Sequence, residues 1–239
     1  MSRIPLKPDC RRIVSTEPSE NSTAAVVVTF ARPEESGAFL RKLGDVRKGK
    51  CGALAAWRGG LENVAVTVIH TGIGPAAAER AIREVLVHEK PRKVISAGFA
   101  GGLDPALRVG DTLASESPAA AILSRATPIE TPAEKIAAFQ QTGARLVDME
   151  TATLAGECAD AGVLLVSVRA VSDSADQFLP VPFAVWFDTA RQRARPLALV
   201  LHLLRSPSHI APFVRFVSRL PSVARALAQA IEGALADIR

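Results

Sequence analysis

Residues 146–176, LVDMETATLAGECADAGVLLVSVRAVSDSAD, contain two groups of carboxylates that flank one expected helix and one expected strand. Asp148 and Glu150 precede an Ala-rich run with helical spacing. Asp173 and Asp176 follow VLLVSVRAV, which is apolar, rich in β-branched residues and short enough to be a buried strand. Carboxylates there are paired, hydrogen-bonded or part of a functional site, because desolvating them is costly. From the acids alone, an ordinary solvated loop remains the alternative.

The composition is that of one globular domain with appended ends. The chain has 239 residues, of which 48% are hydrophobic. We expect an N-terminal arm over 1–23, a main domain over 24–190, and a helical basic extension of the same domain over 191–239. The arm lacks the apolar stretch of a secretory signal, which predicts an intracellular protein. No run reaches the roughly 18 apolar residues of a membrane span.

Charge and cysteine patterns exclude several function classes. Residues 191–239 carry eight Arg and two acids, or +6, whereas the whole chain is +5, so residues 1–190 are close to neutral. These Arg residues punctuate apolar helices and do not alternate with aromatics, which argues against a nucleic-acid partner. The three cysteines, Cys10, Cys51 and Cys158, are widely spaced and predict neither a disulfide framework nor a zinc site. We expect no metal and no cofactor.

The first half of the chain contains short apolar runs typical of buried strands. Strands are expected at 24–30 and 64–69, with a helix from Pro33 to about Leu43 between them. An edge strand is expected at 51–58, followed by a turn at Gly59-Gly60.

Glycine-rich turns follow two expected parallel strands, at 71–74 and at 98–102. The first opens a helix over 76–89, and the second ends a strand over 93–97. Side by side, they could form a floor on which a flat ligand lies against backbone, or they could simply be tight turns. The first also matches a dinucleotide pattern, but no acid ends the following strand to hold a ribose.

The second half reads as loops and helices around the central stretch. Residues 115–132 are expected to be a loop, and Pro132–Gln141 a short helix. Residues 178–187 are rich in Pro and aromatics and could cap a pocket. Three helices are then expected, broken at Pro207 and Pro221, the middle one amphipathic and basic. Packing on the core and contact with a membrane surface are both open for it.

Four motifs in order resemble the purine nucleoside phosphorylase / methylthioadenosine–adenosylhomocysteine nucleosidase superfamily. They are Thr71-Gly-Ile-Gly, Gly98-Phe-Ala-Gly-Gly-Leu with Val109-Gly-Asp, Val147-Asp-Met-Glu, and Arg169-Ala-Val-Ser-Asp-Ser-Ala-Asp. The resemblance implies a three-layer α/β/α fold around a mixed, partly barrel-like sheet. It also implies cleavage of the N-glycosidic bond of a purine nucleoside, and a homo-oligomer.

The resemblance assigns roles to particular residues. Asp173 resembles the acid that assists departure of the purine at N7, and Glu150 the carboxylate that holds the ribose. Glu35 resembles the base that activates water, with Glu34 as a close rival. The remaining substrate-binding candidates are Met149 beside the sugar, Phe99, Ala100 and Gly101 under the base, and Asp148, Thr71 and Gly72 within the motifs.

Two departures from the family pattern refine the expectation. Ser96 and Phe99 stand where related phosphorylases offer phosphate ligands, which favours water over phosphate as the nucleophile. The region between Asp111 and Asp148 is short, so the purine pocket is expected to be open on one side. This short form, with Thr131-Pro-Ala-Glu-Lys, is similar to the hopanoid-associated branch, which implies adenosylhopane as a substrate.

The leading hypothesis is therefore a purine nucleosidase in the cytoplasm, with peripheral contact with the inner membrane through its C-terminal helices. A phosphate-dependent phosphorylase is the alternative within enzymes. A non-catalytic nucleoside-binding or membrane-associated protein is the alternative from another class.

Overall fold

The structure, a computed structural model, describes residues 26–236, so the expected arm at 1–23 and Cys10 lie outside the described residues. The strands are β1 Val26–Phe30, β2 Gly44–Cys51, β3 Leu54–Leu61, β4 Val64–His70, β5 Lys93–Gly102, β6 Thr112–Ser115, β7 Ile122–Ser124, β8 Leu146–Asp148, β9 Leu164–Asp173, β10 Phe187–Asp188 and β11 Arg193–Ala194. The helices are α1 Pro33–Leu40, α2 Pro75–His88, α3 Pro118–Ala121, α4 Pro132–Thr142, α5 Thr151–Asp160, α6 Phe183–Trp186, α7 Pro196–Arg205, the 3₁₀ turn η1 Pro207–His209, and α8 Ile210–Ala236.

A nine-stranded mixed sheet forms the centre of the molecule. Its main path runs β2-β3-β4-β1-β5-β8-β7; β9 also pairs with β5, and β6 pairs with β9. The central strands β4, β1, β5 and β9 are mutually parallel, and all five residues of β1 are buried. Continuous apolar runs suit strands covered on both faces, which explains why these segments form the centre and not the edge.

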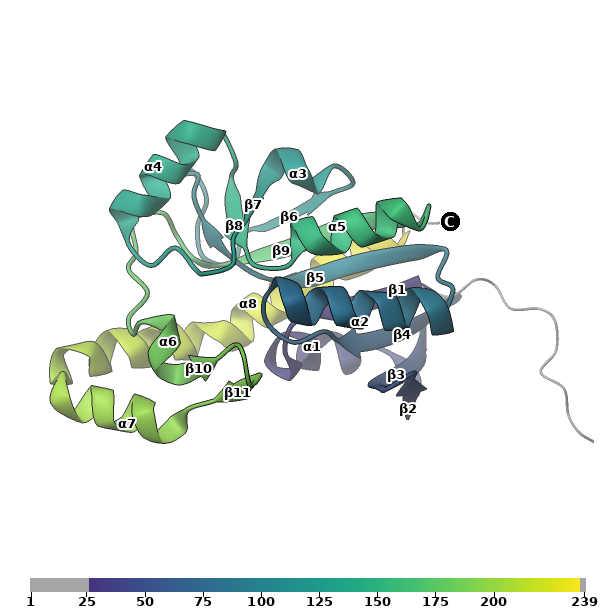
Figure 1. The fold of residues 1–239 in the computed structure, drawn as a ribbon, viewed down its shortest axis with the longest axis horizontal. Helices are drawn as coiled ribbons and strands as arrows, with labels where there is room; N and C mark the ends of the chain where they lie inside the picture. The colour runs from purple at the N-terminus through teal and green to yellow at the C-terminus, as the bar shows by residue number, and fades with distance from the viewer. Residues whose placement is uncertain (1–25, 237–239) are drawn as a thin grey trace, which may run out of the picture.

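Helices cover both faces of this sheet, as Figure 1 shows. α2 and α5 pack together on one face, over a core that includes Val27, Ile82 and Val94. α1 and the second half of α8 cover the other, over Val28 and Leu227. This is the predicted three-layer α/β/α arrangement around a mixed sheet.

The prediction of a turn at Gly59-Gly60 was wrong, because both glycines lie inside β3. β3 is also not an edge strand, since it pairs with β2 and β4. Gly59 is required by close backbone approach: a Cβ there would lie 2.8 Å from the carbonyl oxygen of Gly44, where the β2–β3 register shifts. The chain reverses at Gly52 and Glu62, which have positive φ.

The C-terminal helices differ from the prediction. Pro221 does not end a helix, because it lies inside α8, which is 27 residues long. The second half of α8 buries Val223, Leu227 and Ile231 in the core, and this burial outweighs the lost backbone hydrogen bond. The expected loop at 115–132 also contains α3 and β7. α6, β10, β11, α7 and the start of α8 form a lobe beside the sheet (Figure 1).

Candidate active site

The site lies where β5 changes partners. β1 pairs with β5 only as far as Ser96, and β8 pairs with it at Gly101 and Gly102. The segment of β5 between them has β9 on one side and no strand on the other. A cavity of about 480 Å³ opens here, lined among others by Glu35, Phe99, Ala100, Gly101, Met149, Glu150 and Asp173.

Glu35 points into this break in the sheet. One of its carboxylate oxygens accepts the amide hydrogen of Phe99 at 2.8 Å, and the other that of Arg32 at 3.0 Å. The second bond belongs to the capping box of α1, so the helix start itself fixes the side chain. Burial raises the pKa of Glu35 above its ordinary value, against the lowering effect of the two amides and of Arg169.

Glu34, the rival candidate, lies differently. Its side chain is 59% exposed and forms an ion pair with Arg32 at 2.7 Å. Although both residues line the cavity, Glu35 is the buried carboxylate.

Glu150 sits at the N-cap of α5 and faces the start of α2. Its carboxylate accepts the Gly74 amide hydrogen at 2.6 Å. Burial, and secondarily the negative charge of Asp148, raise its pKa to about 7; the Gly74 amide and Arg169 oppose this shift. Glu150 is therefore a weaker acid than an ordinary glutamate.

Asp173 ends β9 at the side of the cavity that faces α4. It is 4% exposed and accepts the Ser172 hydroxyl hydrogen at 2.6 Å. Its other oxygen is paired with the ammonium of Lys135, which reaches it from α4. Lys135 was not among the residues expected from the sequence.

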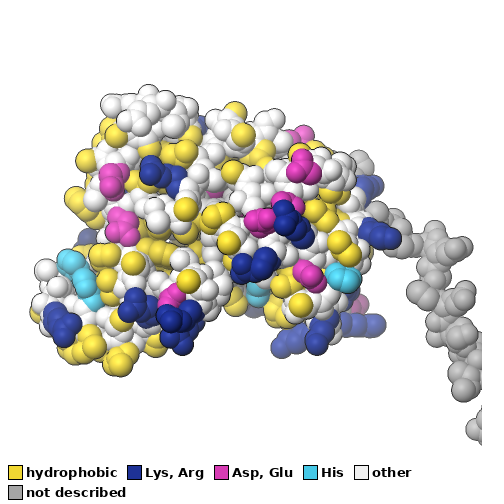
Figure 2. Space-filling view, in the orientation of Figure 1, with side chains coloured by type: hydrophobic (Ala, Val, Ile, Leu, Met, Phe, Trp, Pro, Cys, Tyr) yellow, Lys and Arg dark blue, Asp and Glu magenta, His cyan; other side chains and the backbone are white. Residues whose placement is uncertain are grey.

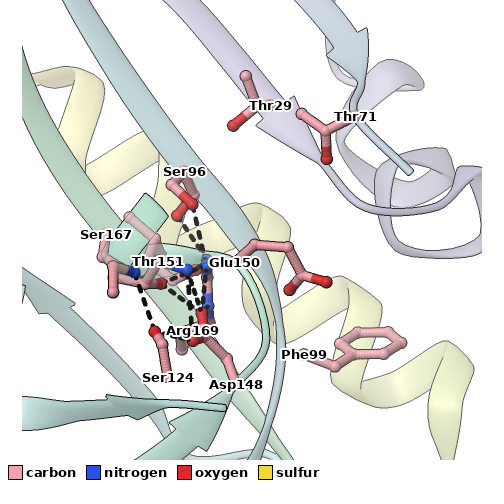
Figure 3. A network of polar contacts seen from close by, with 12 residues as sticks. Thr29, Thr71, Ser96, Phe99, Ser124, Asp148, Glu150, Thr151, Ser167 and Arg169 are labelled. Carbon is pink, nitrogen blue, oxygen red and sulfur yellow. Dashed lines mark hydrogen bonds and ion pairs between the residues drawn. The ribbon is translucent and has the colours of Figure 1, made fainter. Parts of the chain in front are cut away.

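Asp148, which also lines the cavity, forms a buried ion pair with Arg169 at 2.8 Å (Figure 3). Asp148 also accepts hydrogen bonds from Ser124 at 2.6 Å and from Thr151, so its oxygens are occupied within the protein. The Arg169 guanidinium donates further to the carbonyl and hydroxyl of Ser96, at 2.7 and 2.9 Å. This network ties β5, β8, β9 and α5 together at the level of Glu150, which extends away from it toward Phe99 in Figure 3.

The other expected residues divide into three groups. Phe99, Ala100, Gly101 and Met149 all line the large cavity. Thr71 lines an adjoining compartment of about 10 Å³ together with Glu35, Ser96, Glu150 and Arg169. Gly72 is not among the lining residues of either; it has φ +84°, and a Cβ there would lie 2.6 Å from the Gln192 side chain.

The far side of the cavity is apolar and comes from the lobe. Its lining residues there are Leu179, Phe183, Trp186, Phe213, Phe216, Val217 and Leu220. The aromatic-rich segment at 178–187 therefore caps the cavity, as its composition suggested. The contribution of α8 was not expected, because amphipathic spacing marks a helix face without indicating what it covers.

No group of three or more His, Cys, Asp or Glu side chains among residues 26–236 is arranged to hold a metal ion. The polar groups described at the site include carboxylates, backbone amides, the Ser172 hydroxyl and the cations Arg32, Lys135 and Arg169.

Comparison with known proteins agrees with this architecture. The model of the phosphorylase superfamily matches residues 25–119 and 118–205. The chain belongs to the phosphorylase superfamily. This membership confirms the family expected from the four motifs.

Individual relatives of this superfamily are distant in sequence. A 5′-methylthioadenosine/S-adenosylhomocysteine nucleosidase of Geobacillus kaustophilus is 27% identical over 190 residues, covering 59% of this chain and 81% of the relative. A solved structure of a Helicobacter pylori nucleosidase mutant with 5′-methylthioadenosine in its active site matches with a TM-score of 0.66 at 17% identity, over 90% and 99% of the two chains. Futalosine hydrolase of Helicobacter pylori matches with a TM-score of 0.65 at 18% identity, over 89% and 97%.

Proposed function

We propose that this chain hydrolyses the N-glycosidic bond of an adenine nucleoside. The observation that carries the proposal is the convergence of three carboxylates, Glu35, Glu150 and Asp173, on one cavity of about 480 Å³. Membership of the phosphorylase superfamily and the nucleosidase relatives support the same chemistry.

Each carboxylate suits one part of the reaction. Glycosidic cleavage passes through a ribose with oxocarbenium character, so the purine needs a proton and the sugar needs nearby negative charge. Asp173, at the α4 side, assists the purine as it leaves. Glu150 binds the ribose hydroxyls, and Glu35 takes the proton of the attacking water.

The nucleophile is proposed to be water because of the compartment beside Glu35. Its volume of about 10 Å³ is close to the minimum for one water molecule and far below that of phosphate. Arg169, a cation that could bind phosphate, is already occupied by Asp148 and Ser96.

The deciding experiment measures release of free adenine from adenosine, methylthioadenosine, adenosylhomocysteine and an adenosyl-lipid, each with and without phosphate. We expect release without phosphate, and loss of about 10²- to 10⁴-fold in kcat for the D173N variant with its fold retained. Release only with phosphate would make the protein a phosphorylase. Adenine binding without any turnover would make it a nucleoside-binding protein.

We further propose that the 5′ substituent of the nucleoside is large and apolar. The carboxylates of the cavity come from α1, the start of α5 and the end of β9, whereas α8 contributes the apolar side chains of Phe213, Phe216 and Leu220. A small methylthio group would leave most of this apolar wall uncovered, whereas a hydrocarbon such as that of adenosylhopane would bury it.

The same apolar wall continues to the surface. Val217 both lines the cavity and is 43% exposed, and exposed Leu197, Leu204 and Val214 lie on α7 and α8. Figure 2 shows hydrophobic and basic side chains together on this lobe. Among residues 26–236, no single helix is long and apolar enough to cross a membrane. The pair formed by α7 and η1–α8 is long and apolar enough when the two are taken together, but the chain bends by 112° between them.

We propose that this lobe rests on an anionic lipid surface. Three exposed arginines, Arg205, Arg215 and Arg219, have no ion pair with a described residue. At about 1 kcal/mol each near an anionic surface, they would contribute about 3 kcal/mol to binding.

Vesicle co-sedimentation tests this surface. We expect binding to vesicles with about one third anionic lipid, weaker binding to neutral vesicles, and loss of binding in an L204E/V214E variant. V87E is the matched control, because Val87 is 66% exposed on α2, away from the lobe. The resemblance also implies a homo-oligomer, measured by light scattering. If the wild type does not bind vesicles and L204E/V214E dissociates an oligomer, the lobe is an interface between copies of the chain.

A further inference from the structure

Lys135 is the most deeply buried charged side chain of the site. Its relative exposure is 0%, yet it lies only three residues inside the exposed N-terminus of α4. Its ammonium donates to the carboxylate of Asp173, to the carbonyl of Ser174 at 3.0 Å and to that of Gln177 at 2.8 Å. An ammonium has three N–H donors, and all three are used.

This coordination suits the charged form of the lysine. A neutral amine has two N–H donors and would leave one of the three acceptors unsatisfied in a buried place. The same geometry leaves Asp173 as an acceptor on both oxygens, from Lys135 on one and from Ser172 on the other.

The proposed reaction, however, needs Asp173 to give a proton. In the arrangement of the free protein, Asp173 is hydrogen-bonded as a carboxylate and has no proton to give. Two groups donate a hydrogen bond to it, the Ser172 hydroxyl and the Lys135 ammonium, and the ammonium is by far the stronger acid of the two.

We propose that Lys135 supplies, through Asp173, the proton that the leaving purine takes; this rests on the proposed nucleosidase function. As the C1′–N9 bond breaks and its electron pair moves into the purine, a proton moves from Lys135 to Asp173 and on from Asp173 to the base. Water adds its oxygen to C1′ and gives its proton to Glu35. The lysine is left as a neutral amine that regains a proton as Glu35 releases one, so one water is consumed per turnover.

Few other charges act on this pair. On β5, the Cβ position of Gly101 lies 3.4 Å from the Asp173 carboxylate and 3.1 Å from the side chain of Val147 on β8. Asp176 feels the charge of Lys135 and of Arg108; its carboxylate accepts from Ser174 at 2.6 Å and its pKa is lowered, chiefly by that bond. Among residues 26–236, no cation besides Lys135 is hydrogen-bonded to Asp173.

The test is a pH profile of adenine release for the wild type and for the K135M and K135Q variants. In both variants Asp173 must take its proton from solvent. We expect their kcat to be within about fivefold of the wild type near pH 5, and about 10²-fold or more below it near pH 8.5. K135Q keeps a neutral hydrogen-bond donor near Asp173 but removes the transferable proton. Its pH profile therefore tests the proposal if K135M fails to fold.

Two controls separate this role from a structural one. Lys93 is also a buried lysine with an ion pair, to Glu116 at 3.4 Å, but lies at the far end of β5; K93M should show a ratio to wild type that does not change with pH. K135Q added to D173N should cost about twofold or less beyond D173N alone.

The rates of K135Q and of the wild type test the two proposals separately. A K135Q rate that is unchanged, or reduced by the same factor at every pH, would overturn the role of Lys135 while adenine release by the wild type upholds the nucleosidase. A wild type that releases no adenine would overturn both proposals together.

Discussion

Replacing Glu150 by Gln should stabilise the fold above neutral pH while reducing turnover. The pKa of Glu150 is about 7 in the folded chain, against an ordinary value of 4.5, because burial and Asp148 disfavour its charge. A raised pKa contributes stability that is complete below about pH 4.5 and is lost as the pH rises through about 7. At 1.36 kcal/mol per pH unit, the loss is about 3 kcal/mol. The amide of Gln is neutral at every pH, so E150Q avoids this loss of stability.

Urea unfolding at about pH 4.5 and pH 8.5 measures this difference. E150Q and wild type should be similar at the lower pH, and E150Q should unfold at roughly 1 M more urea at the higher pH. E157Q is the matched control, since Glu157 is paired with Arg83 on the surface of α5 and its pKa is lowered. A pH-independent difference between E150Q and wild type would refute the reasoning.

Three further predictions concern the site. In steady-state adenine release, E35Q should lower kcat by about 10²-fold or more while E34Q changes it little, because Glu35 is buried at the cavity and Glu34 is exposed. G98A should lower kcat and leave the melting temperature nearly unchanged, since the added Cβ would lie 3.1 Å from the Glu35 carboxylate. An unchanged kcat would contradict this. R169M should cost about 3–5 kcal/mol in urea unfolding, because it leaves Asp148 buried without its cation.

The parts of the fold that followed from the sequence are those set by local patterns. Apolar runs predicted β1, β4 and β9, and glycines predicted the turn at 71–74 that follows β4. The turn predicted at 98–102 was wrong, because these residues continue β5 as far as Gly102 and pair with β9 and β8. Glu35 and Glu150 are held by helix starts, which have recognisable sequence signals.

Features set by tertiary contacts did not follow. Lys135 meets Asp173 across 38 residues, and nothing in its own helix distinguishes it from a surface lysine. Gly59 resembles a turn until the carbonyl of Gly44 is known to lie against it. Pro221 resembles a helix end because local propensity disfavours it, and only the burial of the residues that follow reverses the balance.

Because α8 runs unbroken from the lobe into the core, the C-terminal segment cannot be handled as a detachable tail. Its first half lines the cavity with Phe213 and Phe216, and its second half packs on α1, the helix that presents Glu35. Glu232 also pairs with Lys42 just beyond α1, at 2.7 Å. A displacement of the lobe would therefore act through one continuous helix on α1, which carries Glu35. Deleting the basic segment would remove part of the core, so only point substitutions can separate surface attachment from folding.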